Sequence, residues 1–185
     1  ALQCDDGYDY VFLCDGMGSG NTAALTSTIS CAFLSRMLRA GSGAENALKM
    51  LNGFLAARGR RENESSTTVD LLEIDHISGE GRLYKCGAAP TLLLRGGEVT
   101  SFFSRTAPVG ILESLDAERI RIELKPGDVL VQVSDGVSGG GERCPWLEKM
   151  LAEKWDGEAE KFARLVLGRA GAQSKDDLSV AVTEL

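Results

Sequence analysis

Two segments in the first third of the chain have apolar residues at a helical spacing. From Asn21 onward, apolar side chains recur at every fourth position, in the series Leu25, Ile29, Phe33 and Met37. Leu34 and Leu38 lie beside this series. A Gly-Ser-Gly interruption at residues 41–43 ends the pattern, and a second one follows over residues 44–58. Apolar residues at spacings of three and four occupy one face of a helix, so both segments are predicted to be amphipathic helices joined by a turn.

Other segments have the composition and spacing of β-strands. Residues 8–14 (YDYVFLC) are rich in aromatic and β-branched side chains, which favours a strand. The apolar runs at 69–74 and 82–86 are separated by Ser-Gly-Glu-Gly, which predicts a hairpin. A second hairpin is predicted at Gly96-Gly97, because two glycines between strand-like runs are typical of a tight turn.

A third hairpin is expected where residues 119–124 (RIRIEL) meet residues 129–134 (VLVQVS) across Pro126-Gly127. Short turns join antiparallel strands, whereas parallel strands need crossovers of about a dozen residues or more. The three hairpins therefore predict an α+β fold with mostly antiparallel sheets. The remaining elements are expected to be helices near residues 145–154 and 158–169, and a closing strand over residues 178–185.

Composition and charge narrow the class of protein. The 185 residues carry a formal net charge of −7, with 43% hydrophobic and 25% charged residues, as is usual for a globular domain. Nucleic-acid-binding proteins usually carry the opposite charge, so no nucleic-acid partner is expected. No apolar run approaches the ~20 residues of a membrane-spanning helix, so this stretch is expected to make no membrane contact. The five cysteines include no CxxC pair, which favours reduced thiols in a cytoplasmic compartment.

Asp15 lies where the first strand runs into a glycine-rich loop. The segment FLCDGMGSG places Gly16, Gly18 and Gly20 after this acid. Such a loop could cradle a phosphate, but a dinucleotide-binding loop needs G-x-G-x-x-G within a parallel β-α-β unit. Asn21 stands where the third glycine is required, and the lysine of a P-loop is absent. The phosphate-cradle interpretation is therefore less favoured.

Two other strands have aspartates at their ends. Asp135 follows the strand VLVQV and precedes a glycine run, and Asp176 and Asp177 precede the closing strand LSVAV. Clustered carboxylates repel one another unless a cation lies between them, and Mg²⁺ and Mn²⁺ prefer carboxylate and carbonyl ligands. The sequence therefore favours a divalent metal site. The alternative is that each aspartate only shapes a turn or caps a helix, because spacing along the chain does not show that they converge.

Several segments taken together resemble the PPM family of metal-dependent protein Ser/Thr phosphatases, and most of all its sporulation-type members. They are DGMGSG, STTVDLLEID, KCGAAP, APVGI, KPGDVLVQVSDGV and KDDLSVAV, in the family's order and over nearly the whole chain. The resemblance implies a four-layer α-β-β-α sandwich with two Mn²⁺ or Mg²⁺ ions at one end. It assigns Asp15 and the carbonyl of Gly16 (D-G-x-G), Asp135 (S-D-G) and Asp176 (closing D-[DN]-x-[ST]) as metal ligands, and the three aspartates as catalytic residues.

The resemblance also implies an activity. A metal-activated water would hydrolyse phosphoserine or phosphothreonine on a phosphoprotein, and the substrate implied is a phosphorylated anti-sigma factor antagonist in sporulation control. The alternative is a catalytically inactive PPM-fold module with a regulatory or binding role.

The family's Gly-Asp-Ser motif, on the strand before D-G-x-G, has no match here. Residues 1–185 are therefore expected to be a single PPM-type phosphatase domain, taken from a longer protein and lacking its N-terminal strand. An uncovered edge on the strand at residues 8–14 would invite pairing with another chain, which makes a homodimer an expectation. The domain is expected to be cytoplasmic, in a full-length protein that is anchored in a membrane.

Overall fold

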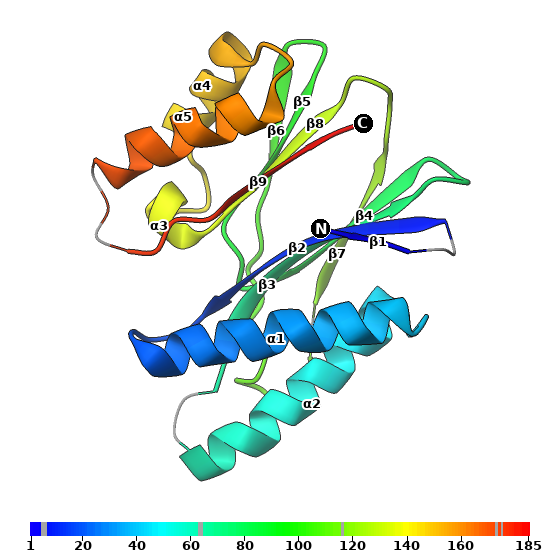
Figure 1. Ribbon diagram of the computed structural model, residues 1–185, viewed down its shortest axis with the longest axis vertical. Helices are drawn as coiled ribbons and strands as arrows, with labels where there is room; N and C mark the ends of the chain where they lie inside the picture. The colour runs from blue at the N-terminus through cyan, green and yellow to red at the C-terminus, as the bar shows by residue number, and fades with distance from the viewer. Residues whose placement is uncertain (5–6, 63–64, 116, 173, 175) are drawn as a thin grey trace. The chain divides into compact units, whose positions relative to one another are not determined.

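The chain divides into two compact units. The computed structural model describes residues 1–4, 7–62, 65–115, 117–172, 174 and 176–185 (Figure 1). The first unit consists of Ala1–Gly87 and Arg105–Glu123, and the second of Ala88–Ser104 and Leu124–Leu185. Each unit contains one β-sheet and its own helices.

In the first unit, the described residues form a sheet of five antiparallel strands in the order β1-β2-β3-β4-β7. The strands are β1 (Leu2–Gln3), β2 (Tyr8–Gly16), β3 (Thr67–Asp75), β4 (Glu80–Cys86) and β7 (Glu118–Glu123). Helices α1 (Asn21–Arg39) and α2 (Ala44–Glu62) cover one face of this sheet (Figure 1). Both predicted helices are confirmed, and α2 continues beyond its expected end.

The face of α1 that packs on the sheet differs from the predicted apolar stripe. Leu34 and Leu38 are buried as core residues, but Leu25 is 48% exposed. Ser30 and Thr26 occupy the buried positions one and two turns before Leu34, and each hydroxyl donates to the carbonyl one turn earlier. A hydroxyl bonded within its own helix is small and satisfied, so it can face a core. A pattern that counts only apolar residues misses it.

In the second unit, four antiparallel strands form a sheet in the order β6-β5-β8-β9 among the described residues. They are β5 (Thr91–Arg95), β6 (Glu98–Phe102), β8 (Val129–Val133) and β9 (Val180–Glu184). The helices of this unit are α3 (Asp135–Ser138), α4 (Pro145–Lys154) and α5 (Ala159–Gly171). Helices α4 and α5 pack on the sheet and bury Leu147, Leu151, Phe162 and Val166. The predicted α+β class with antiparallel sheets is confirmed.

Two of the three predicted hairpins are confirmed. β3 pairs with β4, and β5 pairs with β6 across Gly96-Gly97, whose φ angles of 57° and 86° fit a tight turn. The third hairpin is wrong, because β7 pairs with β4 whereas β8 pairs with β5 and β9. The turn at Pro126-Gly127 therefore carries the chain from one sheet to the other. An alternating pattern identifies a strand but does not identify its partner.

The outer edge of β2 is only partly paired among the described residues. β3 pairs along the whole of β2, from Tyr8 opposite Asp75 to Gly16 opposite Thr67. On the other side, β1 pairs only at Leu2 opposite Tyr10 and at the following residue. The strand expected at this edge from the family's missing motif stays a prediction.

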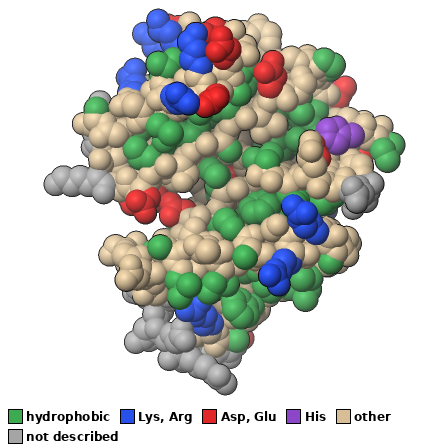
Figure 2. Space-filling model, viewed as in Figure 1, with side chains coloured by type: hydrophobic (Ala, Val, Ile, Leu, Met, Phe, Trp, Pro, Cys, Tyr) green, Lys and Arg blue, Asp and Glu red, His purple; other side chains and the backbone are tan. Residues whose placement is uncertain are grey.

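Charges of both signs lie together around α5 on the face shown in Figure 2. Figure 2 shows Lys, Arg, Asp and Glu side chains side by side around α5, where Lys161 pairs with Asp156 and Arg164 pairs with Glu160. None of the helices that the structure describes is both long and apolar enough to cross a membrane.

Each unit contains an ion pair whose carboxylate is buried. In the first unit, Lys85 of β4 donates to the Asp70 carboxylate of β3 at 2.7 Å, and the two residues are 0% and 1% exposed. In the second, Arg95 of β5 makes two bonds of 2.8 and 2.6 Å to Asp128, which lower the pKa of that carboxyl below its usual value. Removal of one partner from such a pair leaves a buried charge that has lost its main counterion.

Replacement of Lys85 by Met should therefore destabilise the fold strongly. We expect Lys85→Met to lower the free energy of unfolding by about 3–5 kcal/mol, because Asp70 would stay buried without this ammonium. Guanidinium unfolding followed by circular dichroism measures the change. Lys161→Met is the control, since its partner Asp156 lies at the surface and exposed pairs contribute little. If both variants lose the same free energy of unfolding, burial of the pair does not account for the effect of Lys85→Met.

Candidate active site

The end of β2 is held in place through hydrogen bonds to its backbone. Gly16 is paired with Thr67 of β3, and the Thr67 hydroxyl donates to the carbonyl of Asp15 at 2.8 Å. From α1, the Ser27 hydroxyl donates to the carbonyl of Cys14 at 2.7 Å. The backbone that carries Asp15 is thus fixed to both a strand and a helix of the first unit.

Gly16 is required at its position for a steric reason. A Cβ atom there would lie 2.1 Å from the carbonyl oxygen of Ala23, in the first turn of α1. Any side chain would therefore push the helix away from the strand, and glycine allows this close backbone approach. The Asp-Gly dipeptide fixes the start of α1 against the end of β2.

Cys14 lies on the opposite face of β2 from Asp15, because successive side chains of a strand alternate. Its thiol packs against the core of the first unit and is hydrogen-bonded with the thiol of Cys31 of α1. This bond raises the pKa of Cys14 well above its usual value, and it lowers the pKa of Cys31 to about 7. Cys14 is therefore a core residue on the face of β2 opposite Asp15.

In the second unit, Asp135 is the first residue of α3, a helix of four residues directly after β8. The sequence places the acid correctly at the end of this strand but does not predict the helix. Four residues are too few to produce a helical spacing of apolar side chains.

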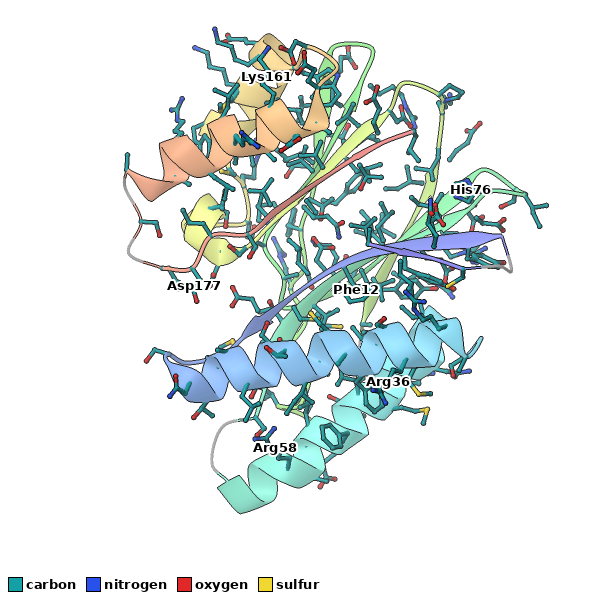
Figure 3. The ribbon with its side chains drawn as sticks, in the orientation of Figure 1. Phe12, Arg36, Arg58, His76, Lys161 and Asp177 are labelled. Atoms are coloured by element: carbon teal, nitrogen blue, oxygen red, sulfur yellow. The ribbon has the colours of Figure 1, made fainter. Side chains whose placement is uncertain are left out.

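Ser134 joins the start of α3 to the segment that leads into β9. Its backbone N–H donates to the carbonyl of Ser179 at 3.0 Å, and its hydroxyl donates to the carbonyl of Asp177 at 3.1 Å. The N–H of Ser179 donates back to the same hydroxyl at 3.0 Å. Figure 3 shows Asp177 on this segment, beside α3. Sequence analysis did not single out Ser134, whose only signal is its place before an Asp-Gly pair.

Gly136 brings the same two segments into direct backbone contact. A Cβ atom at this position would lie 2.3 Å from the carbonyl oxygen of Asp177 and 3.2 Å from the Cβ of Asp176. This backbone contact therefore brings Asp135 close to Asp176, although the two residues are far apart in sequence. Glycine is needed here for the reason that it is needed at Gly16.

Asp135 and Asp176 line one open pocket of about 560 Å³. The other described lining residues are Gly136, Val137, Ser138, Gly139, Gly140, Trp146, Ala170 and Ser174. Asp177 does not line it. Trp146, at the start of α4, was not identified as a site residue from the sequence, because an aromatic residue on a helix usually signals only a core position.

The donor set of this pocket fits a hard divalent cation. Two carboxylates face one pocket, and none of its described lining residues is basic. Asp15 and Gly16 belong to the first unit, whereas Asp135 and Asp176 belong to the second. Each pair of predicted ligands is therefore described within its own unit. Among the residues that the structure describes, no three His, Cys, Asp or Glu side chains are grouped as a complete set of metal ligands.

Residues 5–185 match the family model of stage II sporulation protein E (SpoIIE). The stage II sporulation protein E of Bacillus subtilis (strain 168) is 28% identical over 179 residues, which covers 92% of this chain and 21% of that protein. The chain thus spans about a fifth of the length of this relative.

Two solved structures extend the comparison. The PP2C phosphatase domain of SpoIIE from Bacillus subtilis matches with a TM-score of 0.82 at 26% identity, over 97% of this chain and 58% of that one. The structure of RsbX in complex with magnesium matches with a TM-score of 0.73 at 17% identity, over 97% and 82% of the two chains, and shows likeness of fold alone. The expected resemblance to sporulation-type phosphatases is confirmed, and the chain belongs to the stage II sporulation protein E family, as a domain of the PP2C serine/threonine phosphatase type.

Proposed function

We propose that this chain is a metal-dependent protein phosphatase that hydrolyses phosphoserine or phosphothreonine on a phosphoprotein. The observation that carries the proposal is the pocket in which Asp135 and Asp176 meet without a basic residue among its described lining. A phosphoryl group carries negative charge, and two carboxylates alone would repel it. Cations bound between the acids and the substrate would remove this repulsion.

Oxygen atoms of three aspartates and one backbone carbonyl would hold Mn²⁺ or Mg²⁺. We assign Asp15, the carbonyl of Gly16, Asp135 and Asp176 as ligands, since they are oxygen donors of the kind that hard ions prefer. When bound, two such ions supply the Lewis acid and activate the water that attacks phosphorus. The magnesium in the RsbX structure supports this choice of metal.

Hydrogen bonds within the chain hold the backbone at the proposed metal ligands in place. Thr67 and Ser27 hold the backbone at Asp15, and Ser134 holds Asp135 beside the segment of Asp176. Misplacement of a reacting group by about 1 Å can cost ~100-fold in rate. The hydrogen-bonded backbone therefore serves the chemistry by keeping each carboxylate where a ligand is needed.

The substrate we propose is a phosphorylated anti-sigma factor antagonist in sporulation control. Membership of the stage II sporulation protein E family supports this choice. The same relationship supports a cytoplasmic domain of a membrane-anchored protein, and the partly paired edge of β2 supports a homodimer. A single phosphatase domain made of both units completes the proposal.

Activity should depend on a divalent metal. With p-nitrophenyl phosphate as substrate, we expect turnover with Mn²⁺ or Mg²⁺ and its loss in excess chelator. Asp15→Asn and Asp176→Asn should each lose about 100-fold or more, because a neutral amide is a poorer ligand for a hard ion.

Asp177→Asn is the matched control for Asp176→Asn, since its carboxylate lies outside the pocket, and it should keep most of the activity. Full turnover in chelator would refute the metal mechanism. Calorimetric Mn²⁺ binding without any turnover would instead identify the inactive PPM-fold module.

Gly136→Ala should weaken metal binding without removal of any ligand. The new methyl group would overlap the Asp177 carbonyl, so the segment carrying Asp176 must move away from Asp135. We expect Mn²⁺ affinity, measured by calorimetry, to fall by about tenfold, and the free energy of unfolding to fall by about 1–3 kcal/mol.

Gly168→Ala, on α5 of the same unit, is the control. A Cβ atom there has no neighbour within 4 Å, so this change should stabilise the helix by up to about 1 kcal/mol and leave metal affinity unchanged. If both variants bind Mn²⁺ as the parent does, the backbone contact at Gly136 does not set the geometry of the site.

A further inference from the structure

The pocket of Asp135 and Asp176 is larger than a phosphoryl group. Its volume is about 560 Å³, whereas a water molecule takes about 30 Å³ and a phosphoryl group the room of only a few waters. Pockets of 300–1,000 Å³ usually hold a whole small molecule. Most of this pocket is therefore left for another part of the substrate.

Part of the lining of the pocket is apolar. Trp146 lines it from α4, with Ala170 of α5 and the buried Val137 of α3. Trp146 packs against the core of the second unit, and the guanidinium of Arg169 lies over its ring, 5.0 Å from the centroid. A cation over the ring favours one orientation of the indole, so Trp146 presents a fixed surface to the pocket.

The two hydroxyls that line the pocket each have a hydrogen-bond partner. The hydroxyl of Ser138 accepts from the N–H of Gly140 at 3.4 Å, and the hydroxyl of Ser174 accepts from the N–H of Asp176 at 3.1 Å. The N–H of Gly139 donates to the carbonyl of Asp135 at 2.7 Å. Beside the two carboxylates, the pocket thus offers a ligand the indole of Trp146, the side chains of Val137 and Ala170, and glycine backbone.

We infer that Trp146 is a specificity-determining residue, and that it contacts an apolar side chain adjacent to the phosphoserine of the substrate. This inference rests on the proposed function, since the phosphoryl group must lie at Asp135 and Asp176. Neighbouring Cα atoms of a peptide are 3.8 Å apart. A residue next to the phosphoserine is therefore within reach of the same pocket, and burial of an apolar side chain against an indole is favourable.

Two synthetic phosphopeptides test this inference, one with Leu and one with Gly on both sides of the phosphoserine. We expect the parent, with Mn²⁺, to hydrolyse the Leu peptide with a kcat/KM about tenfold higher than that of the Gly peptide, mainly through KM. Trp146→Ala should bring this ratio close to one, and Trp146→Phe should give an intermediate ratio.

Trp155→Phe is the matched control. Trp155 packs edge-to-face on Phe162 at 5.8 Å, in the core of the same unit and outside the pocket, so the tenfold ratio should persist. A parent ratio near one, or an unchanged ratio in Trp146→Ala, overturns the inference.

Fluorescence gives a readout that does not need turnover. The chain has two tryptophans, so Trp146 is the only one in Trp155→Phe. Non-hydrolysable phosphonate analogues of the two peptides are titrated into this variant. A blue shift of the emission with the Leu analogue and not with the Gly analogue supports the inference, and no shift with either overturns it. If the parent fails to hydrolyse p-nitrophenyl phosphate, the proposed function fails, and this titration still decides whether the pocket binds the side chain.

Discussion

The candidate site depends on two places where the backbone approaches itself too closely for any side chain. At Gly16 the neighbour is the carbonyl of Ala23, and at Gly136 it is the carbonyl of Asp177. In both cases an aspartate precedes the glycine by one residue, so the contact fixes the position of the acid as well. The two units use the same dipeptide against different partners, a helix in one and the segment before a strand in the other.

Local features of the site could be predicted from the sequence, and long-range ones could not. Asp15, Asp135 and Asp176 were identified because each lies beside a strong strand pattern, which is visible within a few residues. The role of Ser134 depends on Ser179 and Asp177, more than forty residues away, and the role of Trp146 depends on a pocket shared with α5. Neither relation leaves a mark in local spacing, whereas the family resemblance brought the acids together as a set.

The same distinction holds for the fold. The glycine pair after Arg95 identified a hairpin because the turn itself needs those φ angles. Pro126-Gly127 also makes a turn, but the strands on either side join different sheets. The buried pair of Lys85 with Asp70 helps to set strand register, because a slip of one residue would move a charge to the other face of the sheet. A pattern of apolar and polar residues does not show which charges will pair.

The path of the chain between the two units has a consequence for how such a domain can change in evolution. The chain passes from one unit to the other at Gly87, returns at Ser104, and leaves again after Glu123. Neither unit is a continuous stretch of sequence, since the hairpin of β5 and β6 interrupts the first and β7 interrupts the second. A single genetic crossover with a relative would therefore combine strands of different parentage within one sheet. Variation in this domain is expected to accumulate by substitution and by changes in its loops, rather than by exchange of whole units.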